Sequence, residues 1–162
     1  MLMELVVDKH AEALLRKLKS QDSNLYLLNT FKARLEPFKI VELRETLFQG
    51  TFIAFAEIEK NGDIENLVMA ALPSIGSGDK SSFLQIIAFA TAQDYFIEAA
   101  LKKLRMVCND EHLKKIKIYI DDTQEMHKKA LLRHGFISEY CIKTFSGHRE
   151  QLSMRIGGED YE

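Results

Sequence analysis

Residues 83–120, FLQIIAFATAQDYFIEAALKKLRMVCNDEHLKKIKIYI, decide the fold. Phe83–Ala90 is mostly apolar on both alternating faces, which is typical of a central strand covered on both sides. A helix is predicted from about Ala92 to Cys108, because apolar residues recur at i, i+3, i+4 and i+7 from Ile97 to Leu104. Ile116–Ile120 predicts a second strand. Strands joined by a helix with short connections form a right-handed crossover, so we expect this pair to be parallel.

The stretch before this unit predicts an antiparallel hairpin. Thr51–Glu59 and Ile64–Leu72 are rich in residues that favour strands, and Asn61-Gly62 between them suits a tight turn with positive φ. Phe38–Arg44 alternates imperfectly, and we interpret it as a strand or as a loop that covers the sheet. The hairpin adds antiparallel pairing to the parallel pair, so the predicted sheet is mixed.

The N-terminal part predicts a strand followed by two helices. Leu2–Val7 is a short apolar run, and Asp8 is placed to cap a helix with apolar residues from Ala11 to Leu18. A second amphipathic stretch runs from about Ser23 to Leu35, and Pro37 prevents its continuation.

The C-terminal part predicts a helix and a last hairpin. The helix runs from about Thr123 to His134 and ends at Gly135, a residue type that takes the left-handed turn after a helix. Strands near Phe136–Phe145 and Gln151–Ile156 follow. The predicted order is β-α-α-β-β-β-α-β-α-β-β, an α+β fold. We expect one domain over residues 1–157 and a polar tail over 158–162.

Composition excludes several classes of function. The chain has 162 residues, 46% of them hydrophobic and 28% charged, which is the range of one globular domain. A net charge of −2 provides no basic field for nucleic acid or an anionic membrane. No apolar run approaches the roughly 20 residues of a membrane span, and MLMELVVDKH carries an acid where a signal peptide carries bases. We expect a cytoplasmic protein.

Two stretches, together with the order of elements, carry a resemblance to a known family. Residues 6–15, VVDKHAEALL, are similar to the opening strand and first helix of the GNAT (Gcn5-related) N-acyltransferases, and residues 130–136, ALLRHGF, are similar to the family's closing helix. The resemblance implies transfer of an acyl group, commonly acetyl, from acetyl-CoA or another acyl-CoA to a small-molecule or protein amine. It implies a cofactor between Phe83–Ala90 and Ile116–Ile120, and it makes a homodimer plausible.

The expected cofactor site departs from the family pattern. The family places glycines where the pyrophosphate meets the helix after Ala90, and this chain has bulky residues there. Thr91 and Asp94 have the spacing of a capping box, which would occupy the first helix amides. The Asp94 carboxylate beside a diphosphate would weaken binding by roughly ten- to a thousandfold. The resemblance implies these cofactor-binding residues: Ile87, Phe89, Ala90, Gln93, Asp94, Tyr95, Phe96 and Gln124.

The departures leave two alternatives open beside the enzyme. One is a catalytically inactive GNAT-like binding or dimerisation module, and the other is an unrelated small α/β ligand-binding domain. The family's usual tyrosine, which protonates the departing thiolate, falls on Leu131, and leucine carries no proton to donate. The candidate acid–base residues are Glu57, Tyr140 and His127, with Glu59, Tyr119 and His134 behind them. His127 and His134 lack an acidic third ligand at helical spacing, so no metal site is expected.

Overall fold

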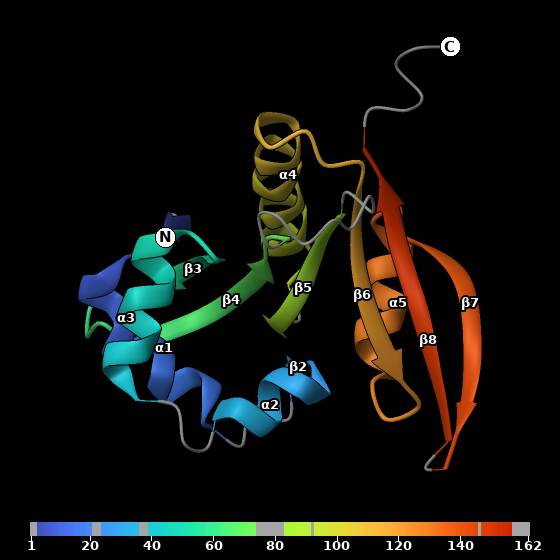
Figure 1. The fold of residues 1–162 in the computed structure, drawn as a ribbon, viewed down its shortest axis with the longest axis horizontal. Helices are drawn as coiled ribbons and strands as arrows, with labels where there is room; N and C mark the ends of the chain where they lie inside the picture. Colours follow the sequence, from blue (N-terminus) through green and yellow to red (C-terminus); the bar gives the residue numbers. More distant parts are fainter. Residues whose placement is uncertain are drawn as a thin grey trace. The chain divides into compact units, whose positions relative to one another are not determined.

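A computed structural model describes residues 3–20, 24–35, 39–73, 83–91, 93–145 and 147–156 (Figure 1). The chain forms two compact units. Unit 1 comprises residues 1–74 and 86–91, and unit 2 comprises residues 75–85 and 92–162. Strand β5 (Phe83–Ala90) therefore contributes its first three residues to unit 2 and its last five to unit 1.

The sheet of unit 1 is built around the predicted hairpin. Strands β3 (Phe52–Ile58) and β4 (Ile64–Ala71) pair antiparallel, and β1 (Met3–Leu5) pairs antiparallel with β3. Gly62 takes a φ of 91°, which confirms the predicted turn. Strand β4 neighbours β5, whose last residues also pair with the short strand β2 (Leu25–Leu27).

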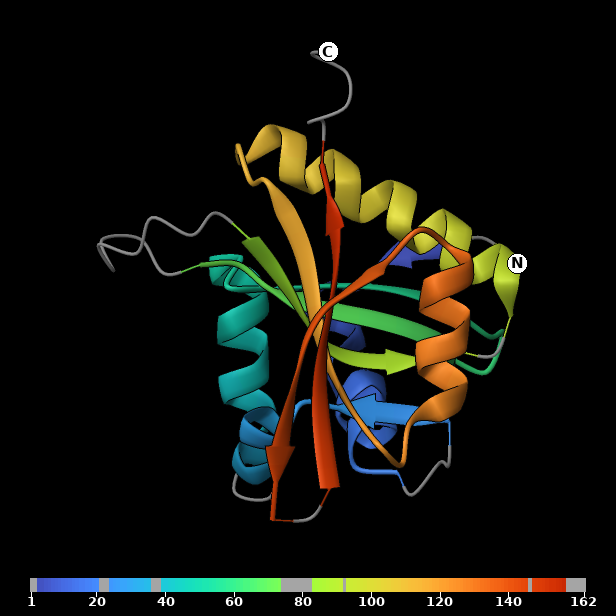
Figure 2. The same cartoon turned by 90° about the vertical axis from the view of Figure 1, so that its right-hand side faces the viewer.

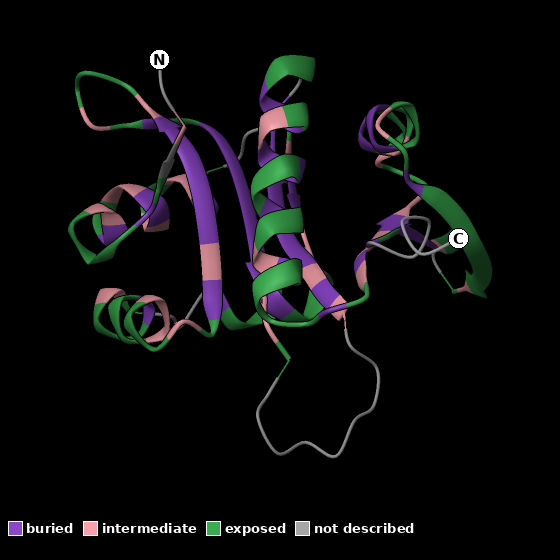
Figure 3. Ribbon diagram, turned by 90° about the horizontal axis from the view of Figure 1, so that it is seen from above, coloured by how far each residue is buried: buried purple, intermediate pink, exposed green. Residues whose placement is uncertain are grey.

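Four helical segments accompany this sheet within the described residues, and all but the first contribute buried side chains to the core of unit 1. They are η1 (Asp8–His10), α1 (Ala11–Leu18), α2 (Asn29–Leu35) and α3 (Ile40–Gln49). The core combines helix residues such as Leu14 and Leu43 with strand residues such as Leu67 and Met69, all fully buried. Figure 3 shows the strands of unit 1 mostly in the colour of buried residues.

Two predicted segments of unit 1 were wrong. The predicted stretch 38–44 begins outside the described residues, and from Ile40 it belongs to α3 and is neither strand nor loop, because Leu43 and Leu47 follow Ile40 at helical spacing and pack on the core. The helix predicted over 23–35 is limited to α2, because backbone pairing with β5 holds Leu25–Leu27 extended.

The predicted cap at the start of the first helix was also wrong. The residue that precedes η1 is Val7, and Asp8 lies inside the first turn. The Val7 N–H donates to His10 Nδ1 at 3.2 Å, so an imidazole takes part in starting the helix.

Unit 2 contains the predicted parallel pair. Residues 83–85 of β5 pair parallel with β6 (Lys115–Asp121), which confirms that prediction. Strand β8 (Gly147–Arg155) pairs antiparallel with β6 and with β7 (Ile137–Thr144), and the register shifts between Ser138 and Tyr140 of β7. The helices are α4 (Asp94–Asp110) and α5 (Glu125–Arg133). Gly135 follows α5 with a φ of 100°, as expected.

The two faces of this sheet differ in character. Ile116, Ile118 and Ile120 of β6 are buried, and both helices contact β6. Arg105 of α4 reaches Met154 of β8 on the same face, and Figure 2 shows α5 along one side of the strands. The alternate residues of β6 lie on the other face, which we name the polar face. Figure 3 shows β7 exposed along its length.

Within the described residues, no helix has the length and apolar character needed to cross a bilayer. The overall result is a mixed sheet with flanking helices, which confirms the predicted α+β class.

Candidate functional site

The parallel ladder between β5 and β6 is short. It consists of three pairs, Phe83 with Lys115, Leu84 with Ile116 and Gln85 with Lys117. Strand β5 continues to Ala90 and β6 continues to Asp121. The last pair, Gln85 with Lys117, thus lies well before the end of either strand.

Three of the predicted cofactor-binding residues lie at the end of β5. Ile87, Phe89 and Ala90 are 4%, 3% and 1% exposed in unit 1, and Ile87 and Ala90 belong to its core. Their side chains face protein interior, so only their backbone groups could serve a ligand.

Those backbone groups already have partners within unit 1. Strand β2 pairs antiparallel with β5, Leu25 with Ala90, Tyr26 with Phe89 and Leu27 with Ala88. The Leu28 N–H donates to the Ile87 carbonyl oxygen at 2.9 Å. Because β4 is a further partner of β5 and a strand has only two edges, β2 takes the edge that β4 leaves. Sequence reasoning missed this pairing, since three residues carry too little pattern to predict a strand.

The first turn of α4, in unit 2, differs from the prediction in its capping. The N-cap is Gln93, and no side chain forms a cap hydrogen bond there, so the predicted capping box of Thr91 and Asp94 is wrong. Asp94 is the first helical residue, too early in the helix to act as the N3 partner of a box. Phe96 is 1% exposed and packs into the interior, whereas Tyr95 is 56% exposed.

The Asp94 carboxylate is directed to two basic side chains at the end of α5. Its Oδ1 accepts a hydrogen bond from Arg133 Nη2 at 3.0 Å and lies 3.0 Å from His134 Nε2. The hydrogen bonds from His134 and Arg133 hold the pKa of Asp94 below its usual value. The Asp94 carboxylate, which the sequence analysis expected beside the diphosphate of the cofactor, is therefore in contact with two basic side chains.

Gln124 closes the turn between β6 and α5. Its Oε1 accepts a hydrogen bond from the Asp121 N–H at 3.1 Å, and Asp121 Oδ1 accepts one from the Thr123 N–H at 2.9 Å. This residue is the N-cap position of α5, and the structure gives its side chain a local structural contact.

The structure does not bring the three candidate acid–base residues together as one group. Glu57 lies in unit 1, where it is 2% exposed and its Oε1 accepts a hydrogen bond from Asn66 Nδ2 at 3.0 Å. In unit 2, His127 is buried in α5 on the helix side of the sheet, and Tyr140 lies on the polar face. Leu131, at the place of the family's tyrosine, is fully buried.

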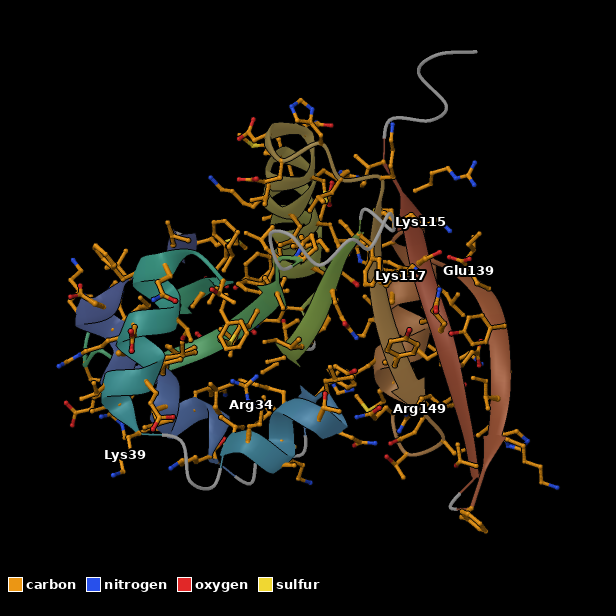
Figure 4. The ribbon with its side chains drawn as sticks, viewed as in Figure 1. Arg34, Lys39, Lys115, Lys117, Glu139 and Arg149 are labelled. Atoms are coloured by element: carbon orange, nitrogen blue, oxygen red, sulfur yellow. The ribbon has the colours of Figure 1, made fainter. Side chains whose placement is uncertain are left out.

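Tyr140 belongs to a charged cluster that sequence reasoning missed. Its register partner is Gln151, which also pairs with Tyr119, and the two tyrosine hydroxyls are hydrogen-bonded. Burial and this hydrogen bond raise the pKa of Tyr119. We name the group the Tyr119 cluster; four members are labelled in Figure 4, and its residues are Lys115, Lys117, Tyr119, Glu139, Tyr140 and Arg149.

Charges in the Tyr119 cluster are unevenly paired. Glu139 accepts hydrogen bonds from the Ser153 hydroxyl and from Lys115 Nζ, the latter at 3.1 and 3.2 Å, and these contacts lower its pKa. Lys117 Nζ lies 4.3 Å from the centre of the Phe83 ring. Neither Lys117 nor Arg149 forms an ion pair within the part of the chain that the structure describes. The alternation in KIKIYID was the signal that could have revealed this face.

Among the described residues, no group of three or more histidine, cysteine, aspartate or glutamate side chains could hold a metal ion.

Comparisons with known proteins identify the fold. An acetyltransferase of the GNAT family from Streptococcus pneumoniae has a TM-score of 0.71 at 14% identity, and the match covers 96% of this chain and 99% of that one. A ribosomal-protein alanine acetyltransferase from Vibrio fischeri has a TM-score of 0.67 at 13% identity, with 96% and 93% covered. A spermidine N-acetyltransferase from Vibrio cholerae has a TM-score of 0.64 at 10% identity, with 96% and 95% covered.

The chain therefore has the GNAT fold over nearly its whole length, which removes the alternative of an unrelated α/β fold. No family model matches the sequence. No curated protein matches it either.

Proposed function

We propose that the chain is a GNAT-type N-acyltransferase that uses acetyl-CoA or another acyl-CoA and acts on an amine. The observation that carries the proposal is the GNAT fold itself, which matches acetyltransferases along 95% or more of this chain. The three-pair ladder of β5 and β6 supports it, because β6 continues beyond Lys117 without pairing to β5 and can offer backbone groups to a pantetheine arm.

The chain offers a place for each part of such a co-substrate. The backbone of Ile87–Ala90 in unit 1 would accept the pantetheine arm in competition with β2, which pairs with it. In unit 2, amides in the first turn of α4 would meet the pyrophosphate, since a helix start favours an anion. Arg133 and His134 beside Asp94 reduce the repulsion that the Asp94 carboxylate would otherwise exert.

The chemical step needs a proton acceptor and a proton donor. The free amine attacks the thioester carbonyl carbon, the C–S bond breaks, the amine loses a proton and the departing thiolate gains one. Of the three predicted residues, Tyr140 is 44% exposed, whereas Glu57 and His127 are buried. Tyrosine hydroxyls are protonated at neutral pH and can donate a proton, so the tyrosine pair is the candidate donor to the thiolate. The raised pKa of Tyr119 makes its own hydroxyl a weaker acid.

Titration with acetyl-CoA tests the binding step. We expect heat in calorimetry and a rise in the melting temperature, because a ligand that binds only the folded state stabilises it. Turnover is then measured by release of free thiol with polyamines, amino acids and peptide N-termini as acceptors. Absence of both heat and thermal shift at millimolar acetyl-CoA would refute the proposal.

A second candidate function has a specific observation in its favour. Strand β2 occupies the backbone edge of β5 that a pantetheine arm would use, and bulky residues replace the glycines of the α4 turn. Both features suit a GNAT-like module that binds a partner or dimerises without chemistry. Measured turnover that disappears in a Tyr140→Phe, Tyr119→Phe double variant would exclude this candidate.

Cytoplasmic location, a homodimer and a single domain over residues 1–157 remain predictions beside this proposal.

A further inference from the structure

We propose that the acyl acceptor is a small amine that also carries an anionic group, a carboxylate or a phosphate, and that this group binds to the Tyr119 cluster. The inference rests on the proposed acyl transfer and adds the class of its acceptor. Its basis is the arrangement of charges on the polar face of unit 2.

The cluster stands on a rigid part of the fold. Tyr119 pairs with Gln151 and Tyr140 pairs with the same residue, so three adjacent strands hold the two hydroxyls in place. Lys117 and Tyr119 alternate with Ile116, Ile118 and Ile120, whose burial anchors β6 from the other side. A site on paired strands keeps its geometry better than one on a loop.

The charge balance of the cluster is positive although the chain carries −2 overall. The cluster holds three cations, Lys115, Lys117 and Arg149, and one carboxylate, Glu139. Lys115 and the Ser153 hydroxyl already bind Glu139. Asp121, the register partner of Arg149, lies on the same face and directs its Oδ1 to Thr123; with this second carboxylate counted, the group still carries one net positive charge. Lys117 and Arg149 are thus left to attract an external anion.

The available donors suit a carboxylate or a phosphate. A guanidinium group can donate two parallel hydrogen bonds to either anion, and an ammonium group adds a point charge. The hydroxyls of Tyr119 and Tyr140 lie on the strands between them. In register, Lys117 and Arg149 are separated by four positions, roughly 14 Å along the strands, with Tyr119 midway between them, so an anion at Tyr119 lies between the two long basic side chains.

Position along β6 connects this cluster with the proposed chemistry. Lys117 forms the last pair with β5, at Gln85. Under the proposed function, the acyl-CoA thioester would come to the end of this ladder, at the pair of Gln85 with Lys117. An acceptor held by Lys117 and Arg149 would then present its amine beside the tyrosine pair. A polycationic acceptor would meet cations of its own sign.

Matched acceptors test the charge requirement. Each pair differs only in the anion: phosphoethanolamine against ethanolamine, and glutamate against its dimethyl ester. We expect a KM about tenfold lower for the anionic member, with the difference reduced at high salt. The two pairs separate phosphate from carboxylate as the preferred anion. Equal or better turnover of neutral amines or spermidine would overturn the inference.

Variants locate the effect on the polar face. Lys117→Gln and Arg149→Gln should each raise the KM for the preferred anionic acceptor by about tenfold and leave kcat within about twofold. Lys102→Gln is the matched control, since Lys102 is an exposed cation on α4. An equal KM in the two cluster variants and in the control would overturn the assignment.

A binding measurement separates this inference from the proposed function. Thermal shift with phosphoethanolamine alone, without acyl-CoA, reports the anion site in the wild type and in Lys117→Gln. A shift in the wild type that Lys117→Gln loses supports the site even where no turnover is found, and only the acyl transfer is then refuted. Turnover without any dependence on the acceptor's anion refutes the inference and leaves the acyl transfer standing.

Discussion

The end of β5 in unit 1 and the polar face of unit 2 use their hydrogen-bonding groups in opposite ways. At Ile87–Ala90 the side chains are buried and β2 pairs with the backbone. On the polar face the backbone pairs within the sheet, and Lys117 and Arg149 remain without ion pairs among the described residues. The two regions show that the fold alone does not determine which backbone or side-chain groups remain available to bind a ligand. Under the proposed function, acyl-CoA would compete with β2 for the edge of β5, whereas an anionic acceptor would meet Lys117 and Arg149.

The largest expected effect is on stability, and it compares the buried core of unit 1 with the exposed strand β7 of unit 2. Leu67 is fully buried in the core of unit 1, so Leu67→Ala should lower the free energy of unfolding by about 2–5 kcal/mol through lost contacts and a cavity. Ile142 of β7 is 49% exposed, and Ile142→Ala should stay within about 0.5 kcal/mol of the wild type. Urea unfolding measures both. Similar losses in the two variants would mean that β7 is as tightly packed as the core.

The next effect tests whether β2 competes with acyl-CoA. Leu28→Pro removes the N–H that donates to Ile87, while Leu28→Ala keeps it and serves as the control. Because one hydrogen bond contributes about 0.5–1.5 kcal/mol, the proline variant should bind acetyl-CoA roughly two- to tenfold more tightly than the alanine variant. Calorimetric titration gives both dissociation constants. Equal values would show that β2 and the co-substrate do not share this edge.

Substitution of Glu139 tests whether the charge of the Tyr119 cluster controls acceptor binding on the polar face. Glu139→Gln removes the only carboxylate among the six residues of the Tyr119 cluster and releases Lys115. We expect the KM for an anionic acceptor to fall by roughly two- to fivefold, opposite in sign to the effect of Lys117→Gln. Steady-state kinetics with phosphoethanolamine and glutamate measures it. A rise in KM would indicate that Glu139 contacts the acceptor's amine instead.

The smallest effect concerns pH at the start of α4. The lowered pKa of Asp94 means that its contacts with His134 and Arg133 contribute stability above its usual pKa of 3.8, and this contribution is lost as pH falls through the lower folded value. Asp94→Asn should therefore melt slightly below the wild type near pH 6, and the difference should vanish in acid. Asp110→Asn, on the exposed end of α4, is the control. A constant difference at all pH values would contradict the assignment.

Much of the fold could be predicted because its elements carry strong local patterns. The alternation of the hairpin strands, the helical spacing of α4 and the Gly135-Phe136 ending of α5 each determine an element from neighbouring residues. Strand β2 could not be predicted, because its partner is more than 60 positions away and its three residues do not form a pattern. Segment 38–44 was misjudged because its apolar positions begin a helix that continues to Gln49.

Less of the candidate site could be predicted. The sequence identified Asp94 and Tyr140, but the partners that define their environment come from distant positions. Arg133 lies 39 positions after Asp94, and Tyr119 meets Tyr140 only through the register of β8. Such contacts depend on tertiary packing, and local periodicity carries no information about them.

The register shift between Ser138 and Tyr140 has a consequence for the exposed strand β7. An outermost strand with free backbone groups invites strands of other molecules to add to it, which leads to aggregation. A bulge bends and twists such a strand, and nearby charges such as Lys143 oppose stacking. The register shift in β7 thus opposes the addition of strands from other molecules. Deletion of Glu139 would restore regular pairing, and concentrated samples of this variant should precipitate.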